Sequence, residues 1–188
     1  DVRKPAVRDY VRQVLGTVTR EWGFSLLKLD FLYAACMVPH AGLNRGELMA
    51  DALDLVRDAV PAETRLLLCG VPLASAFGRA EYCRIGCDVG LDWDDKPQMR
   101  LLHRERVSTK NSHANTIGRA HLDGLAFRCD PDVFFLREDT ALTSEQRERL
   151  LSADTTCGGV LLTSDDMGEW TKDQVSRYRR ATAEFCRR

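Results

Sequence analysis

Two aspartates come at the ends of short apolar runs, each with a basic residue a few positions earlier. Asp30 follows Lys28 by two residues in the run 25–31, and Asp88 follows Arg84 by four. Such runs indicate buried strands of a parallel sheet, where a carboxylate is costly unless it is paired. Because α/β barrels carry their chemistry at the carboxyl ends of strands, both aspartates are candidate catalytic residues.

Two carboxylates that face each other across a pocket are the groups that glycoside hydrolysis needs. One attacks the sugar carbon, and the other protonates the leaving oxygen and then deprotonates water. Alternation along a strand places Lys28 on the face of Asp30, where its ammonium favours the ionised form of a nucleophile. Arg84 shares a face with Asp88 and could hold a substrate hydroxyl. Both aspartates could instead cap helices or pair with these basic residues, and the pattern leaves both interpretations open.

Helices and strands alternate along the chain and position these residues. Strands are predicted at residues 25–32, 65–73, 82–89, 125–129 and 160–163, with an extended run at 133–136. Helices are predicted at residues 5–22, 44–59, 108–122, 143–153 and 171–185, and residues 90–107 form a predicted loop. Three of the helices begin with the capping pairs Asn44–Glu47, Thr143–Gln146 and Thr171–Gln174.

This order predicts an α/β fold with a parallel sheet and right-handed crossovers. Four of the five strands end in Asp, directly or after a few polar residues, and no glycine-rich phosphate loop follows any strand, which favours a (β/α)8 TIM-type barrel over an open sheet. A complete barrel needs about 250 residues, whereas this chain has 188. We therefore expect an incomplete barrel with about five parallel strands, in which residues 1–188 form the C-terminal portion of one catalytic domain.

Composition argues against several functional classes. The net charge is −1 with no basic stripe, and no apolar run approaches the ~18 residues of a membrane span. We therefore expect neither nucleic acid nor a membrane as partner. Seven cysteines, several of them inside apolar runs, indicate reduced thiols in a cytoplasmic protein. No histidine is placed to complete a zinc site, so we expect no metal and no cofactor.

Motifs at the strand ends also carry a family resemblance. In chain order they are Lys28-Leu29-Asp30, Leu68-Cys69-Gly70, Arg84-Ile85-Gly86-Cys87-Asp88, Asp130-Pro131-Asp132 and Ser164-Asp165-Asp166-Met167. Together they resemble the C-terminal part of the catalytic barrel of α-galactosidases (melibiases) of glycoside hydrolase families 36 and 27. Each motif is weak alone, and their order over nearly the whole chain is what makes the resemblance specific.

The resemblance implies a retaining hydrolase that acts on terminal α-galactosides through a covalent glycosyl-enzyme. It implies that Asp30 is the nucleophile and Asp88 the acid/base, and that Lys28, Arg84 and Cys69 contact the sugar. The chain departs from the family pattern at Gly70, where a glutamate is common. It also departs at Arg128 and Cys129, which precede Asp-Pro-Asp in place of an aromatic residue and an asparagine. We expect the 188-residue chain alone to be inactive, because half a pocket cannot hold a sugar for attack.

The remaining strand-end residues have weaker claims to chemistry. Asp130, Asp132, Asp165 and Asp166 are predicted mainly to form structural hydrogen bonds. Trp93 could be a sugar platform or could pack onto the rim of the barrel.

Two other functional classes stay open. One is a metal-dependent barrel hydrolase that uses several strand-end aspartates, although no histidine-rich strand end supports it. The other is a non-catalytic sugar-binding or assembly fragment. Because the outer strands of an incomplete barrel expose hydrogen-bonding edges, we expect self-association or association with the missing N-terminal half of the barrel.

Overall fold

The computed structural model describes residues 1–94, 101 and 107–188. Positions 95–100 and 102–106 of the predicted loop lie outside the described residues. The chain divides into two compact units, Asp1–Cys83 and Arg84–Arg188, with the boundary inside strand β3 (Tyr82–Arg84). That both units belong to one catalytic domain stays a prediction.

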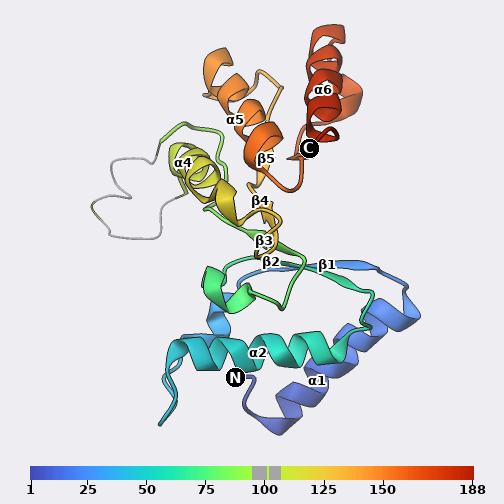
Figure 1. The fold of residues 1–188 in the computed structure, drawn as a ribbon, viewed down its shortest axis with the longest axis vertical. Helices are drawn as coiled ribbons and strands as arrows, with labels where there is room; N and C mark the ends of the chain where they lie inside the picture. Colours follow the sequence, from blue (N-terminus) through green and yellow to red (C-terminus); the bar gives the residue numbers. More distant parts are fainter. Residues whose placement is uncertain (95–100, 102–106) are drawn as a thin grey trace. The chain divides into compact units, whose positions relative to one another are not determined.

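The first unit alternates helices with parallel strands (Figure 1). Its elements are α1 (Pro5–Gly16), a π-helical turn (Thr17–Glu21), β1 (Leu26–Leu29), a 3-10 turn (Leu32–Cys36), α2 (Arg45–Ala59), β2 (Arg65–Leu68), a second 3-10 turn (Leu73–Ala76) and the start of β3. β1 pairs in parallel with β2, with Leu27 opposite Leu66, and β2 pairs in parallel with β3, with Leu68 opposite Cys83. The predicted parallel α/β arrangement is confirmed in this unit.

Helix α2 supplies the main apolar face of the first unit. The Glu47 amide donates to Asn44 Oδ1 at 3.0 Å, and the Asn44 amide donates to Glu47 Oε2 at 2.8 Å. This capping box confirms the predicted start of the helix. The buried residues of α2 are Leu48, Met49, Ala52, Leu53, Leu55, Val56 and Ala59. Each large side chain among them contributes roughly 1.5–3 kcal/mol by leaving water, and α1 packs along the same helix (Figure 1).

Strand β1 is buried on one face only, which corrects the prediction of a fully buried strand. Leu27 is buried, but Leu26 is 44% exposed and Lys28 is exposed as well. In β2, by contrast, Leu66, Leu67 and Leu68 are all buried. The two strands differ in burial because β1 pairs with β2 alone among the described strands and so forms an edge of the sheet.

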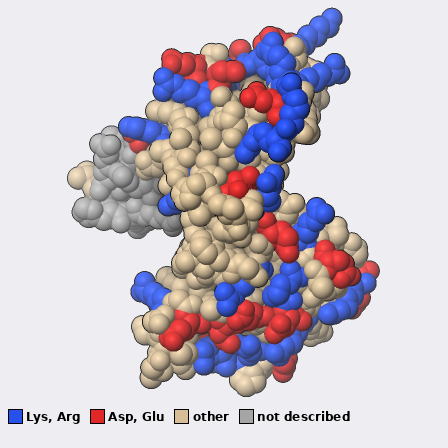
Figure 2. All heavy atoms as spheres, in the orientation of Figure 1, with Lys and Arg blue, Asp and Glu red and all other residues tan. Residues whose placement is uncertain are grey.

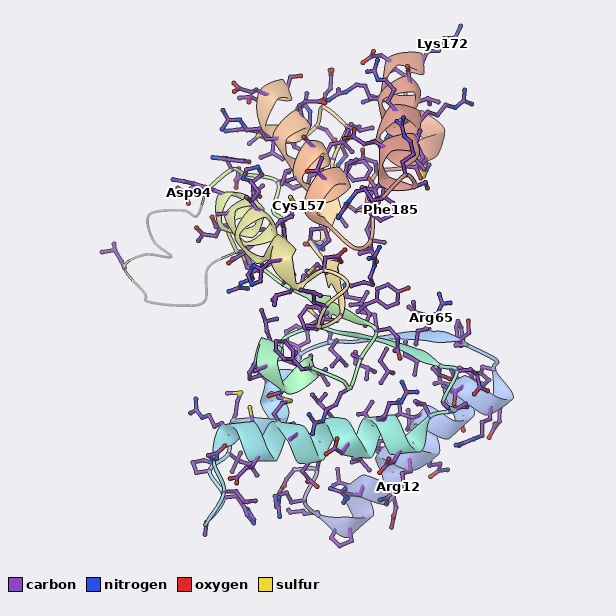
Figure 3. All side chains as sticks on the ribbon, viewed as in Figure 1. Arg12, Arg65, Asp94, Cys157, Lys172 and Phe185 are labelled. Carbon is purple, nitrogen blue, oxygen red and sulfur yellow. The ribbon has the colours of Figure 1, made fainter. Side chains whose placement is uncertain are left out.

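The second unit also combines parallel strands with helices. Its elements are α4 (Thr109–Arg119), a 3-10 turn (Ala120–Leu122), β4 (Arg128–Asp130), β5 (Val133–Phe134), α5 (Ser144–Cys157), β6 (Leu162–Thr163), another 3-10 turn (Met167–Glu169) and α6 (Lys172–Phe185). Figure 3 labels Cys157 and Phe185 at the ends of α5 and α6. β5 pairs in parallel with β6, and the Ile85 amide, which follows β3, donates to the Asp130 carbonyl of β4 at 3.0 Å.

The chain between residues 125 and 136 forms two short strands, which corrects the predicted single strand with an extended continuation. Pro131 has no amide to donate, and Asp132 adopts a left-handed conformation with φ of 83°. Ladder pairing therefore stops after β4 and resumes at β5 with a new partner, β6.

The core of the second unit lies among β5, α5 and α6. Its buried residues are Phe134, Phe135, Leu136, Leu142, Leu150, Leu151 and Ala181. Thr143 with Gln146 and Thr171 with Gln174 form the capping boxes predicted for α5 and α6. The Gln174 side chain also donates to the Leu136 carbonyl at 2.7 Å, which links the start of α6 to the core.

The surface carries charges of both signs. Basic and acidic side chains are interspersed on the face seen in Figure 2, in keeping with the net charge of −1. Among the residues that the structure describes, no helix combines the length and the apolar character needed to cross a membrane. None of the seven cysteines forms a disulfide in the described part of the chain.

Candidate active site

The first group of candidate residues lies at the carboxyl end of β1. Lys28 and Asp30 are both exposed, so Asp30 is not the buried carboxylate that the apolar run predicted. The edge position of β1 explains this difference. Asp30 Oδ1 accepts the amide of Phe31 at 2.7 Å, a bond within the loop rather than a cap on a following α-helix. The amide of Cys69 donates to the Leu29 carbonyl at 2.8 Å, which fixes the end of β1 against β2.

Cys69 and Gly70 follow β2 beside this group. Cys69 is buried, and its carbonyl accepts the Leu32 amide at 3.3 Å. Gly70 has a φ of +70°, and a β-carbon there would lie 3.0 Å from Cδ1 of Tyr33. The departure from the family pattern at Gly70 therefore has a local reason, since a side chain would be strained and would displace the Tyr33 ring. Contact of Lys28 and Cys69 with sugar stays a prediction.

The second group is organised around Arg84, whose side chain is only 3% exposed. Its Nη1 lies 2.9 Å from Asp88 Oδ1, its Nε 3.0 Å from Asp130 Oδ2 and its Nη2 2.6 Å from Asp132 Oδ1. A buried guanidinium requires such partners, because taking its charge out of water is expensive. Asp88 differs from the other two carboxylates because its side chain is 69% exposed. Asp88 therefore contacts the buried Arg84 while most of its own side chain remains exposed to solvent.

The sequence predicted a strand that reaches Val89, but strand β3 ends at Arg84. Asp88 therefore lies in the loop that follows β3. The ion pair of Arg84 with Asp88 agrees with the alternative in which Asp88 pairs with its neighbouring basic residue, which the sequence left open beside a catalytic role. Arg84 as a direct sugar contact stays a prediction, since each of its three guanidinium nitrogens already faces a carboxylate.

Asp130 and Asp132 fix this arrangement through backbone hydrogen bonds. Asp130 Oδ1 accepts the amide of Asp132 at 2.8 Å, and Asp132 Oδ2 accepts the amide of Val89 at 2.7 Å. Asp132 thus ties the loop that carries Asp88 to the turn after β4. Burial raises the pKa of Asp132, and the nearby Arg84 partly offsets the rise.

Asp154 on α5 is a further member of this group that the sequence reasoning did not identify. It is 2% exposed, and within the described part of the chain its Oδ2 has no hydrogen-bond partner. Burial, followed by the negative charges of Asp132 and Asp130, raises the pKa of Asp154 well above its ordinary range. The sequence gives no signal for a buried Asp154, because an aspartate within an amphipathic helix is normally expected on the exposed face.

Asp165 and Asp166 make the structural hydrogen bonds that were predicted for them. Asp165 Oδ2 accepts the amides of Leu136 and Arg137 and the indole N–H of Trp170, at 2.6, 3.0 and 3.1 Å. Asp166 Oδ1 accepts the amide of Gly168 at 2.8 Å. Asp165 thereby connects the segment after β6 to the segment after β5.

The ring of Trp93 packs against other side chains. Its centroid lies 5.7 Å from that of His113, and the ring also contacts the apolar core of the second unit. These contacts agree with packing of a loop aromatic onto the structure, one of the two interpretations of Trp93. Its use as a sugar platform stays a prediction.

Comparison with solved structures identifies relatives of this fold. An α-galactosidase from Thermus thermophilus, solved with stachyose, matches 93% of the chain with a TM-score of 0.75 and 28% identity. The same enzyme solved with p-nitrophenyl α-D-galactopyranoside matches 94% at 29% identity. The chain has an α-galactosidase-like fold. α-Galactosidase I from Mortierella vinacea matches 90% of the chain with a TM-score of 0.70 and 16% identity.

The α-galactosidase-like chain is much shorter than these relatives. It covers 36% of the Thermus thermophilus chain and 45% of the Mortierella vinacea chain. The relatives are TIM-barrel glycosidases, and this chain corresponds to part of the barrel, which confirms the predicted fold class. No family model matches the sequence.

Proposed function

We propose that the protein is a retaining glycoside hydrolase that acts on terminal α-galactosides. The observation that carries the proposal is the fold match at 28–29% identity to an enzyme solved with stachyose and with p-nitrophenyl α-D-galactopyranoside. The exposed carboxyl group of Asp88 follows β3 and contacts the buried Arg84, which supports the proposal because barrel enzymes carry their catalytic groups after strand ends. Seven cysteines, several of them buried, favour a reducing compartment such as the cytoplasm.

In the proposed double displacement, Asp30 attacks the anomeric carbon while Asp88 donates a proton to the leaving oxygen. Asp88 then removes a proton from water, which attacks the galactosyl-Asp30 ester and regenerates both carboxyl groups. The two displacements return the sugar with its original α configuration. This mechanism requires Asp30 and Asp88 to face each other about 5–5.5 Å apart.

The test replaces Asp30 in the complete protein, because the 188-residue chain alone is expected to be inactive, and follows hydrolysis of p-nitrophenyl α-D-galactopyranoside. We expect Asp30→Ala to lose at least about 10³-fold in kcat, whereas Asp9→Ala, an exposed control on α1, should match wild type. Azide should restore part of the activity of Asp30→Gly and give β-galactosyl azide, because a single displacement inverts the anomeric carbon. Full activity of Asp30→Ala, or β-galactose as the first product of wild type, would remove the proposed mechanism.

A non-catalytic sugar-binding or assembly role is the second candidate, and the exposed edge of β1 supports it. Saccharide binding without turnover would favour this role over hydrolysis. The metal-dependent alternative lacks comparable support, because Arg84 occupies the middle of the carboxylate group. Among the described residues there is no cluster of potential ligands arranged to hold a metal ion.

A further inference from the structure

Phe31, directly after Asp30, has an unusual backbone conformation. Its φ is 55° and its ψ is 29°, the left-handed region that a bulky aromatic residue rarely adopts. Apart from Phe31, Asp132 is the one non-glycine residue with positive φ in the described part of the chain. Strained positions of this kind concentrate at active sites and ligand clamps, where the surrounding structure enforces them.

Hydrogen bonds on both sides hold Phe31 in this conformation. Its amide donates to Asp30 Oδ1 at 2.7 Å, and its carbonyl accepts the amide of Ala34 at 3.0 Å. The next amide, that of Leu32, donates to the Cys69 carbonyl at 3.3 Å. The direction of the Phe31 side chain is therefore set by Asp30 and by the end of β2.

The ring that results is displayed rather than buried. Phe31 is 66% exposed, and its centroid lies 6.2 Å from that of Tyr33 in an edge-to-face arrangement at 65°. Tyr33 is itself 38% exposed and rests on Gly70, where a β-carbon would lie 3.0 Å from its ring. A strained backbone that exposes an apolar ring gives the first unit no folding advantage, so the pair points to a bound molecule.

We propose that Phe31 and Tyr33 form an aromatic platform for a saccharide ring beside Asp30, with Gly70 leaving the space that Tyr33 needs. This inference rests on the proposed function. A pyranose presents an apolar C–H face, and in galactose the axial 4-hydroxyl leaves the C3, C4 and C5 hydrogens together on one face. Such a face stacks on an aromatic ring, and polar groups nearby set its orientation. The ring that stacks is either the galactosyl unit or the sugar to which it is attached.

The test is Phe31→Gly in the complete protein, with Phe31→Trp as the variant that keeps an aromatic ring. Glycine accepts a φ of 55° without strain, so Phe31→Gly should keep or raise the Tm. We expect its KM to rise about tenfold with kcat little changed, because stacking binds ground state and transition state alike. Phe31→Trp should stay within about threefold of wild type. Phe24→Ala removes another exposed ring of the first unit and should leave KM unchanged.

Two substrates locate the stacked sugar. A higher KM for both p-nitrophenyl α-D-galactopyranoside and stachyose assigns the galactosyl ring, whereas a higher KM for stachyose alone assigns the leaving sugar. An unchanged KM in Phe31→Gly overturns the platform and leaves the proposed function standing. A lower Tm in Phe31→Gly, or an equal effect of Phe24→Ala, also overturns it, because the ring would then serve packing.

Saturation-transfer NMR with methyl α-D-galactopyranoside separates failure of the platform from failure of the proposed function. If wild type cleaves neither substrate but binds this galactoside, and Phe31→Gly abolishes the binding, hydrolysis fails and the platform stands. If wild type neither cleaves nor binds, both fail.

Discussion

Arg84 is the residue on which the acidic side chains of the second unit converge. One guanidinium contacts Asp88, Asp130 and Asp132, and Asp154 adds a fourth carboxyl group within the same electrostatic field. Three of the four carboxyl groups, those of Asp130, Asp132 and Asp154, are buried, and a buried negative charge is costly unless it is paired. Burial, followed by the charges of Asp132 and Asp130, raises the pKa of Asp154 well above its ordinary range, so Asp154 holds a proton more readily than an exposed aspartate does.

This arrangement predicts how the stability of the protein depends on pH. The pKa of Asp154 is higher in the folded than in the unfolded chain, so its contribution to stability is complete below the unfolded value of about 4. The contribution is lost as pH rises from there through the folded pKa. Asp154→Asn cannot ionise, so its unfolding free energy relative to wild type should increase with pH above about 4.

Urea unfolding of both proteins between pH 4 and 8 measures this difference. Asp173→Asn, an exposed aspartate at the start of α6, is the control and should show no comparable trend. A difference between Asp154→Asn and wild type that stays constant over the whole range would show that Asp154 keeps an ordinary pKa in the folded protein.

At the scale of elements, the turns that follow the strands decide where the candidate residues lie. The left-handed residues Phe31 and Asp132 come shortly after β1 and β4, and Gly70 follows β2 with positive φ. Asp132 accepts the Val89 amide, and directly after Phe31 the Leu32 amide donates to the Cys69 carbonyl. The points at which the strands end therefore help to position the candidate residues.

Two glycines should respond to alanine in opposite directions. Gly70→Ala places a β-carbon at positive φ and 3.0 Å from the Tyr33 ring, so we expect a loss of about 1–2 kcal/mol of stability. Gly118 lies on α4, where an added β-carbon would meet no atom within 4 Å, and Gly118→Ala should gain up to about 1 kcal/mol. Chemical denaturation of the two variants checks both signs, and a neutral Gly70→Ala would show that Tyr33 moves aside freely.

At the scale of the whole molecule, the chain has an exposed sheet edge and corresponds to 36% of its Thermus thermophilus relative. β1 carries exposed Leu26 at this edge, next to exposed Trp22 and Phe24. Unpaired strand edges with apolar neighbours favour pairing with another chain. The same feature supports association with the remainder of a barrel or with a second copy.

We predict that the 188-residue chain self-associates at micromolar concentration through this edge. Leu26→Lys should shift the equilibrium toward monomer, because a charge on an edge strand opposes pairing. Leu125→Lys, at an 87% exposed site of the second unit, is the control and should leave it unchanged. Sedimentation equilibrium measures both, and a monomeric wild-type chain at these concentrations would contradict the prediction.

Local sequence patterns predicted the order of helices and strands, the parallel α/β class and the starts of the capped helices. These features follow from local periodicity and from capping pairs three residues apart, such as Thr143 with Gln146. Local spacing placed Arg84 and Asp88, four residues apart, on one face and left pairing between them as one of two interpretations, and the structure forms that pair.

Long-range packing brings the other groups of the site together. Asp130 and Asp132 contact Arg84 from 46 and 48 residues away, and Asp154, 70 residues away, is influenced by the charges of all three. No short-range pattern encodes such an arrangement. The sequence did not determine burial either, since two similar apolar runs became the buried strand β2 and the half-exposed strand β1. Burial depends on which segments cover a strand, and that is settled by long-range packing.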